Sequence, residues 1–232
     1  MKIELLNESL FSNYDKFLLS NKNNLFYASL KYLLFLEKIL DCKYYVLLVL
    51  ENNNIQGCLP LIYKDGNLGR VYNSLPFYGS NGGIISNSKD AIDLLLKKYN
   101  EITSHDNVAS SNYIENPLNK LFIEKKINYN EEDYRIGQFT PLILDNPNKI
   151  ENSELLMQSL HTKTRNTIRK AIKSDISISI DNESTNFVKN EHIKGMIKIN
   201  GKPKSDLFFK VFLNLLQQVK TIIFLLLKKM EL

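Results

Sequence analysis

The sequence has only two cysteines and three histidines among its 232 residues. Cys42 and Cys58 lack C-x-x-C spacing, and the histidines at positions 105, 161 and 192 are scattered without the H-x-x-x-H spacing of metal ligands. A disulfide scaffold and a zinc site are therefore not expected, and no metal is predicted. This cysteine usage is typical of a protein of the reducing cytoplasm.

Long hydrophobic runs are also missing. The longest, residues 44–50 and 222–227, fall well short of the roughly 20 apolar residues that a membrane-spanning helix requires. Glu4 and Glu8 interrupt the apolar residues at the N-terminus, which argues against a signal peptide. The sequence therefore predicts no transmembrane segment and a cytoplasmic location.

Several common catalytic motifs are absent as well. The chain has no G-x-S-x-G, G-x-G-x-x-G or G-x-x-x-x-G-K-[ST] segment, and no cysteine with an obvious histidine partner. These absences argue against the usual nucleophilic hydrolases, dinucleotide-binding folds and P-loop enzymes. The composition, 44% hydrophobic and 24% charged, is that of an ordinary globular protein.

Charge is distributed unevenly along the chain. Residues 1–160 contain 16 basic and 19 acidic residues, whereas residues 161–232 contain 14 basic and 6 acidic ones. The excess of basic over acidic residues is concentrated in residues 161–173, HTKTRNTIRKAIK, which include no acidic residue. Arg165, Arg169 and Lys173 follow helical i, i+4 spacing, and like charges on one helix face repel. The pattern favours an anionic partner, which can be the phosphate of a nucleotide or sugar carrier, an RNA backbone, or carboxylates on the other unit of the chain. A solvated helix face is the alternative.

Apolar periodicity predicts a mixed sheet with helices over residues 1–148. Strands are expected at 2–6, 44–50, 55–63, 68–75, 108–114 and 134–144, and helices near 11–18, 28–40, 89–102 and 117–127. Ser88 is the expected N-cap of the third of these helices, and the asparagines of residues 51–54 suit a hairpin turn. The predicted fold class is α/β or α+β, with a domain boundary near residues 145–148.

Residues 149–232 begin a second unit in this prediction. One long helix is expected over residues 154–174 with Ser153 as its N-cap, then a strand at 176–180 and helices at 187–200 and 206–219. The apolar run at 221–227 reads as a strand that needs partners on both sides. The second unit is therefore expected to be incomplete, and self-association through this strand is predicted.

A glycine-rich segment follows the fourth predicted strand. Residues 74–85, SLPFYGSNGGII, contain three of the nine glycines of the chain together with two aromatic residues. Glycines let a ligand approach the main chain, and aromatic side chains can form a wall of its site. A plain turn between strands is the alternative. The substrate-binding candidates of this segment are Phe77, Tyr78, Gly79, Asn81, Gly82 and Gly83.

Three segments in order resemble the FemAB-like (peptidoglycan aminoacyltransferase-like) branch of the GNAT acyltransferase superfamily. IQGCLPLI at 55–62 is similar to the family's "g.lPl" strand, and LPFYGSNGGI at 75–84 to its "lPfygsyGG" loop. KTRNTIRKAIK at 163–173 resembles the family's "K.R..IrkA.k" helix, which a strand follows as it does here.

The resemblance implies two GNAT-like units in tandem, the second of them partial, and transfer of an acyl or aminoacyl group to an amine. The donors it implies are acyl-CoA or aminoacyl-tRNA as substrates, with no tightly bound cofactor. The acceptors are anionic sugar-nucleotide or peptidoglycan precursors of the bacterial cell envelope. Lys163, Arg165 and Arg169 are then expected to face the anionic substrate, and no catalytic residue is identified. Nucleic acid other than tRNA is not expected as a partner.

The sequence also departs from the family pattern. Family members continue beyond the point that corresponds to Leu232, and the [QR]-x-x-G-x-[GA] pyrophosphate-binding segment of CoA-dependent members is missing. The alternative prediction is therefore a shortened, non-catalytic binding module that lacks the donor site. RNA binding through the basic helix is a third hypothesis.

Overall fold

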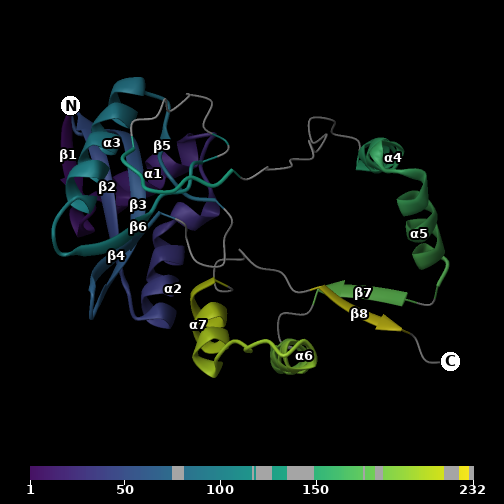
Figure 1. The fold of residues 1–232 in the computed structure, drawn as a ribbon. Coiled ribbons are helices and arrows are strands. Elements are labelled where there is room, and N and C mark those ends of the chain that lie inside the picture. Colours follow the sequence, from purple (N-terminus) through teal and green to yellow (C-terminus); the bar gives the residue numbers. More distant parts are fainter. Residues whose placement is uncertain are drawn as a thin grey trace. The chain divides into compact units, whose positions relative to one another are not determined.

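The computed structural model divides the chain into two compact units (Figure 1). The first comprises Met1–Asp133 and Gly195–Thr221, and the second comprises Tyr134–Lys194 and Ile222–Leu232. The predicted boundary near residue 148 stays a prediction. The residues that the structure describes are 1–74, 81–116, 118, 127–134, 149–174, 176–180, 185–216 and 225–229.

A mixed sheet forms the centre of the first unit, in the order β1-β2-β3-β4-β6, with β5 also paired to β3. The first four strands are antiparallel to their neighbours, whereas β6 runs parallel to β4. The strands are β1 (Lys2–Leu5), β2 (Lys43–Glu51), β3 (Asn54–Gly66), β4 (Gly69–Asn73), β5 (Ile85–Ser86) and β6 (Val108–Asn112). The predicted mixed sheet flanked by helices is confirmed.

Local sequence signals explain the first hairpin and the third helix. Asn52 and Asn53 both adopt positive φ, of 49° and 63°, in the turn that joins β2 to β3. Asparagine tolerates this conformation better than most residues. The Ser88 hydroxyl accepts a hydrogen bond from the Ala91 amide at 3.3 Å, so the predicted N-cap of α3 (Lys89–Thr103) is confirmed.

Helices cover both faces of this sheet. Side chains of alternating β2 and β3 residues, such as Leu47 and Leu59, form one buried cluster with α3. The residues between them, such as Leu48 and Cys58, are also fully buried and face the opposite side, because side chains alternate along a strand. The other helical segments before β2 are the 3-10 turns η1 (Glu8–Leu10) and η2 (Phe26–Ala28), and the helices α1 (Phe11–Ser20) and α2 (Leu30–Leu40).

A helix from the end of the chain returns to the first unit. α7 (Asp206–Leu216) packs against α2, and the Phe35 ring lies 5.6 Å from the Phe208 ring and 6.0 Å from the Phe212 ring, centroid to centroid. The Ser205 hydroxyl accepts a hydrogen bond from the Phe208 amide at 3.2 Å, as an N-cap does. The first unit is therefore discontinuous in sequence.

The second unit contains α4 (Lys149–Ser159), α5 (Thr162–Ile172), β7 (Ile176–Ile180) and β8 (Leu225–Lys229). β7 and β8 form an antiparallel two-stranded sheet. The last apolar run therefore has a strand partner on one edge, where the sequence predicted an unpaired strand as the basis for self-association. α6 (Thr185–Lys198) spans the boundary between the units at residues 194 and 195.

The predicted single helix over residues 154–174 is wrong, because the chain turns between α4 and α5 at Leu160 and His161. Ser153, the predicted N-cap, lies inside α4. The cap of α5 is instead His161, whose Nδ1 accepts a hydrogen bond from the Lys163 amide at 3.2 Å. The helix predicted at 117–127 and the strand at 134–144 fall almost wholly outside the described residues.

Candidate functional site

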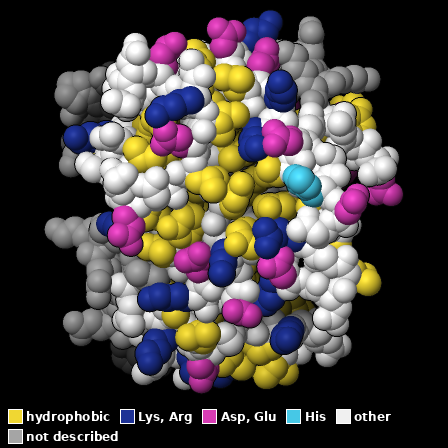
Figure 2. Space-filling view, turned by 90° about the vertical axis from the view of Figure 1, so that its left-hand side faces the viewer, with side chains coloured by type: hydrophobic (Ala, Val, Ile, Leu, Met, Phe, Trp, Pro, Cys, Tyr) yellow, Lys and Arg dark blue, Asp and Glu magenta, His cyan; other side chains and the backbone are white. Residues whose placement is uncertain are grey.

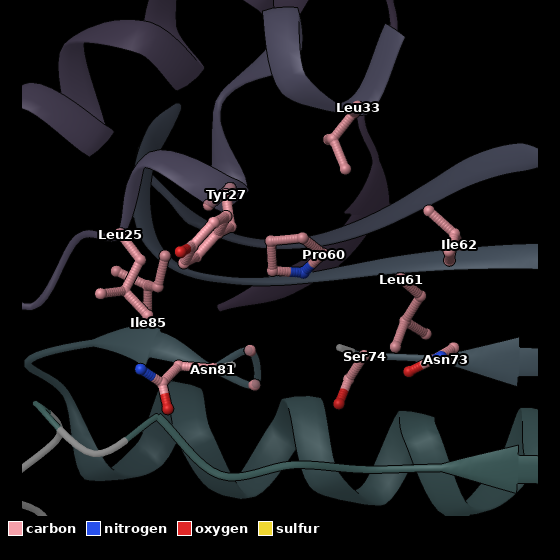
Figure 3. A pocket seen from close by; sticks show the side chains of 13 residues that line it. Leu25, Tyr27, Leu33, Pro60, Leu61, Ile62, Asn73, Ser74, Asn81 and Ile85 are labelled. Atoms are coloured by element: carbon pink, nitrogen blue, oxygen red, sulfur yellow. The ribbon is translucent and has the colours of Figure 1, made fainter. Parts of the chain in front are cut away.

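The first unit contains a small pocket of about 20 Å³ beside the middle of β3 (Figure 3). In the view of Figure 3 the Tyr27 ring lies to the left of Pro60, and the Asn81 amide lies below and to the left of both. The described lining residues are Leu25, Tyr27, Ala28, Leu33, Pro60, Leu61, Ile62, Asn73, Ser74, Asn81, Gly82, Gly83 and Ile85. The pocket is therefore mostly apolar, with polar groups at a few positions.

Strand pairing explains why the pocket forms at this place. β4 pairs with β3 up to the partners Asn73 and Ile62, whereas β5 pairs with β3 at Ile85 and Cys58. Between these pairings, residues 59–61 of β3 have no strand partner on this edge among the described residues. Pro60, which has no N–H to donate, occupies the middle of this gap, where a missing donor costs least.

Two of the segments that carry the family resemblance meet at this pocket. Residues 60–62 belong to the segment 55–62, and Gly82 and Gly83 belong to the segment 75–84. They are about 20 positions apart in the sequence, and the β3–β4 and β3–β5 pairings bring them together.

Side-chain hydrogen bonds connect the chain segments next to the pocket. The Ser74 hydroxyl accepts a hydrogen bond from the Ile114 amide at 2.8 Å. The Asn116 side chain, 1% exposed, donates to the carbonyl of Asn23 at 2.9 Å and to that of Ile84 at 3.4 Å. These bonds tie the residues after β6 to both the loop before β5 and the segment before η2.

Burial shifts the pKa of several groups in this region. The pKa of the Tyr113 hydroxyl is raised by desolvation, as is that of the Glu115 carboxyl. Burial also raises the pKa of the Cys58 thiol to about 12, so that this cysteine is protonated at neutral pH and is a poor nucleophile. The pocket region therefore offers no activated thiol among the described residues.

Glu115→Gln is expected to raise the melting temperature only slightly at pH 7, because the Glu115 side chain is exposed and water screens its charge, and to leave it unchanged at pH 4. A carboxyl whose pKa is raised in the folded state favours folding below its unfolded-state pKa, and this contribution is lost as the pH rises through the folded-state value. Glutamine resembles the protonated form at every pH. Thermal unfolding of both proteins at the two pH values checks this, and a variant less stable at pH 7 contradicts it.

The basic helix α5 lies in the second unit and is exposed to solvent along its length, with no buried residue. No carboxylate among the described residues forms an ion pair with its cations. Its side chains differ in what they contact. Among the residues that the structure describes, the Arg169 guanidinium donates to the Asn166 side chain alone, at 3.3 Å.

Arg165 is engaged at the turn between the helices. Its Nη1 donates to the carbonyls of Leu160 at 2.6 Å and Gln158 at 3.2 Å, and its Nη2 donates to the Thr162 hydroxyl at 3.1 Å. Carbonyls at the end of a helix lack intrahelical partners, and a cation there also interacts favourably with the helix dipole. Arg165 therefore caps α4 and fixes the turn into α5.

Arg165→Ala is expected to destabilise the second unit by about 1 kcal/mol, because the carbonyl bonds of the guanidinium are lost. Arg165→Lys should restore only part of the lost stability, because an ammonium group lacks the forked geometry with which a guanidinium reaches two acceptors. Arg169→Ala is the matched control, with little expected change. Thermal unfolding followed by circular dichroism measures all three, and equal effects of the two alanine variants would disprove the capping role.

The structure places the predicted site residues in two separate groups. Asn81, Gly82 and Gly83 line the pocket of the first unit. Lys163, Arg165 and Arg169 lie on α5 in the second unit. Phe77, Tyr78 and Gly79 lie outside the described residues. A substrate-binding role for any of these nine residues stays a prediction.

The sequence prediction missed the wall formed by the segment before α2. Leu25 and Tyr27 line the pocket, but they belong to a segment without glycine, motif or periodic pattern. The Tyr27 ring packs edge-on against the Tyr32 ring of α2, at 5.4 Å between centroids. This ring contact is local, but the meeting of the segment with β3 and with residues 81–83, more than 30 positions away, leaves no local signal in the sequence.

On the side of the first unit shown in Figure 2, acidic and basic side chains are interspersed around a hydrophobic band. This face therefore presents no extended surface of one charge.

Within the described ranges, no helix is long and apolar enough to cross a membrane.

Comparison with known proteins shows the fold. No protein-family model and no curated protein matches the sequence. Among solved structures, the chain is similar to the crystal structure of FemX, with a TM-score of 0.58 and 12% sequence identity. The match covers 94% of this chain and 56% of the FemX chain, so this chain spans little more than half of the protein it matches. The fold is FemAB-like, as the sequence resemblance predicted.

Proposed function

We propose that the chain acts as a FemAB-like N-acyltransferase, which transfers an acyl or aminoacyl group to an amine of a peptidoglycan or cell-envelope sugar precursor. The proposal places the protein in the cytoplasm of a bacterium. The donor is an acyl-CoA or an aminoacyl-tRNA, consumed as a substrate. The FemX-like fold supports this proposal, and the observation that carries it is the meeting of two family-like segments at one pocket.

In the proposed reaction the acceptor amine attacks the carbonyl carbon of the donor. A C–N bond forms, the C–S or C–O bond to the carrier breaks, and the amine loses a proton as the thiol or hydroxyl carrier leaves. Positioning accounts for much of the acceleration in such a transfer. The small pocket of the first unit is the candidate place for one substrate, and Gly82 in its wall has no side chain to obstruct an approaching group.

The proposal assigns the anionic part of the acceptor or carrier to the exposed cations of α5. Lys163 and Arg169 are the stronger candidates of the predicted three, because Arg165 is already bonded to helix carbonyls. A charge-assisted hydrogen bond to phosphate is worth more than a neutral one.

A thermal-shift titration of the full chain tests the proposal. A UDP-linked peptidoglycan precursor should raise the melting temperature in a concentration-dependent way, because a ligand that binds only the folded state stabilises it by mass action. UDP alone separates binding of the nucleotide from binding of the whole precursor. A further shift with acetyl-CoA supports a donor site in this chain. Binding of the precursor without any donor-dependent shift or transfer favours the non-catalytic binding module, and a folded protein that responds to neither ligand contradicts the proposal.

A further inference from the structure

Some asparagines of the chain are followed by a small residue, either glycine or serine. They are Asn73, Asn81, Asn87, Asn152 and Asn200. In such a pair the backbone nitrogen of the second residue can attack the side-chain carbonyl of the asparagine, because little or no side chain obstructs it. The attack needs a nitrogen that has lost its proton and a backbone that can bring the two groups together. A hydrogen bond donated by that N–H opposes both.

Three of these pairs contain a serine whose amide is held in this way. The Ser74 amide donates to the Asn112 carbonyl at 2.9 Å, and the Ser88 amide donates to the Ser86 hydroxyl at 3.0 Å. Ser153 lies inside α4, where a backbone amide donates to a carbonyl of the helix. The backbone nitrogen is therefore protected from reaction after Asn73, Asn87 and Asn152.

The pair Asn200–Gly201 is protected by the end of a helix. Asn200 follows α6 with φ of 54°, and its amide donates to the Ile197 carbonyl at 3.0 Å. The Gly201 amide donates to the Met196 carbonyl at 2.8 Å. These are the two bonds of a Schellman motif, which fixes the residues after the last turn of a helix. The Gly201 nitrogen is therefore held as a hydrogen-bond donor.

The pair Asn81–Gly82 lacks this protection. Neither the Asn81 side chain nor the Gly82 amide makes a hydrogen bond to another described residue. In Figure 3 the Asn81 amide group points away from the Asn73 and Ser74 side chains. Both residues of the pair lie outside any helix or strand and are partly exposed, so water can reach them. Among the five pairs, this is the one whose attacking nitrogen the described structure leaves unbonded.

We propose that Asn81 is a site of spontaneous deamidation. The Gly82 nitrogen loses its proton to water or hydroxide and forms a bond to Cγ of Asn81. The bond from Cγ to the side-chain nitrogen breaks, and ammonia leaves with a proton from the solvent. The product is a cyclic succinimide. Addition of water to one or the other carbonyl of this ring gives aspartate or isoaspartate, and in isoaspartate the main chain runs through the former side chain.

Deamidation changes the pocket of the first unit in two ways. Either product adds a carboxylate to a wall whose described residues include no charged side chain, and a partly buried charge without a partner is unfavourable. Isoaspartate also lengthens the main chain close to Gly83, which packs tightly against the backbone at residues 114–116. The melting temperature is therefore expected to fall as the protein ages. The site goes beyond the proposed function and does not depend on it.

Peptide mass spectrometry of the full chain tests the assignment. The folded protein and the protein unfolded in guanidinium chloride are incubated at the same mildly alkaline pH, and the change from amide to carboxyl is followed at Asn81 and Asn200. In the folded protein Asn81 should convert at least about tenfold faster, because Asn200 reacts only when its cap opens. In the unfolded chain the two Asn-Gly pairs should convert at similar rates.

Two results would overturn the assignment. One is a folded protein in which Asn81 converts no faster than Asn200. The other is a preference for Asn81 that is equally large in the unfolded chain, since the fold would then have no part in it.

A variant tests which nitrogen reacts. Gly82→Ala adds a methyl group beside the attacking nitrogen and restricts the backbone, so conversion at Asn81 should slow while conversion at Asn200 stays the same. Circular dichroism checks that the variant is folded. A folded Gly82→Ala protein that converts Asn81 as fast as the parent overturns the assigned chemistry.

Discussion

Replacing Gly83 with alanine is expected to destabilise the protein by about 2 to 5 kcal/mol and to deform the pocket. Gly83 has φ of +80°, a conformation that L side chains rarely adopt. A Cβ at this position would lie 2.5 Å from the Ile114 carbonyl oxygen and 3.0 Å from the Asn116 amide nitrogen. Both atoms belong to the backbone, so the strain cannot be relieved by rotation of a side chain.

Thermal or urea unfolding measures this effect, and Gly195→Ala is its matched control. Gly195 lies inside α6, and a Cβ there would meet no atom within 4 Å. Alanine in a helix interior is more favourable than glycine by up to about 1 kcal/mol. Gly195→Ala should therefore leave the stability unchanged or increase it. A Gly83→Ala protein as stable as the parent contradicts the conformation assigned to the loop before β5.

Phe35→Ala is expected to cost about 3 to 5 kcal/mol of stability. The Phe35 side chain is 1% exposed and contacts Tyr32 within α2 as well as Phe208 and Phe212 of α7. Its loss leaves a cavity at the contact between two helices that lie far apart in the sequence. The same substitution should therefore increase hydrogen exchange of the α7 amides.

The matched control is Phe187→Ala in α6. The Phe187 side chain is 53% exposed, so its removal should change the stability by less than about 1 kcal/mol. Chemical denaturation combined with hydrogen exchange distinguishes the two variants. Unchanged protection of α7 in Phe35→Ala would show that α7 does not depend on α2, and would contradict the discontinuous first unit.

Much of the first unit could be predicted because its signals are local. The Asn52–Asn53 turn, the Ser88 cap and the alternating apolar residues of β2 and β3 each follow from the preferences of neighbouring residues. The return of α7 onto α2 could not, because its amphipathic pattern shows that a face is buried but not which partner covers it.

The break between α4 and α5 shows a second limit. Residues 154–174 contain neither glycine nor proline, so hydrophobic periodicity predicts one continuous helix. The structure ends α4 with bonds from the Arg165 side chain and starts α5 with a bond to His161. Whether such side-chain caps form depends on the three-dimensional positions of the donor and acceptor groups, which helix propensities do not describe.

The candidate site was predictable in part. Of the glycine segment, Asn81, Gly82 and Gly83 line a pocket, and their role in binding a substrate stays a prediction. The wall that contains Leu25 and Tyr27 could not be predicted, because it forms only where this segment meets β3 and residues 81–83. The assignment of Arg165 to an anion rested on helical spacing, which did not reveal its contacts with the α4 carbonyls.

Mass spectrometry of the acceptor tests the central claim most directly. The full chain is incubated with a UDP-linked peptidoglycan precursor and either an acyl-CoA or an aminoacyl-tRNA, and the mass of the precursor is followed with time. The account predicts that the precursor gains one acyl or aminoacyl group. The gain should be slower with Asn81→Asp, which changes a residue of the pocket, than with Asn13→Asp, which makes the same change on an exposed turn of α1. A folded chain that binds the precursor but leaves its mass unchanged with every donor contradicts the account.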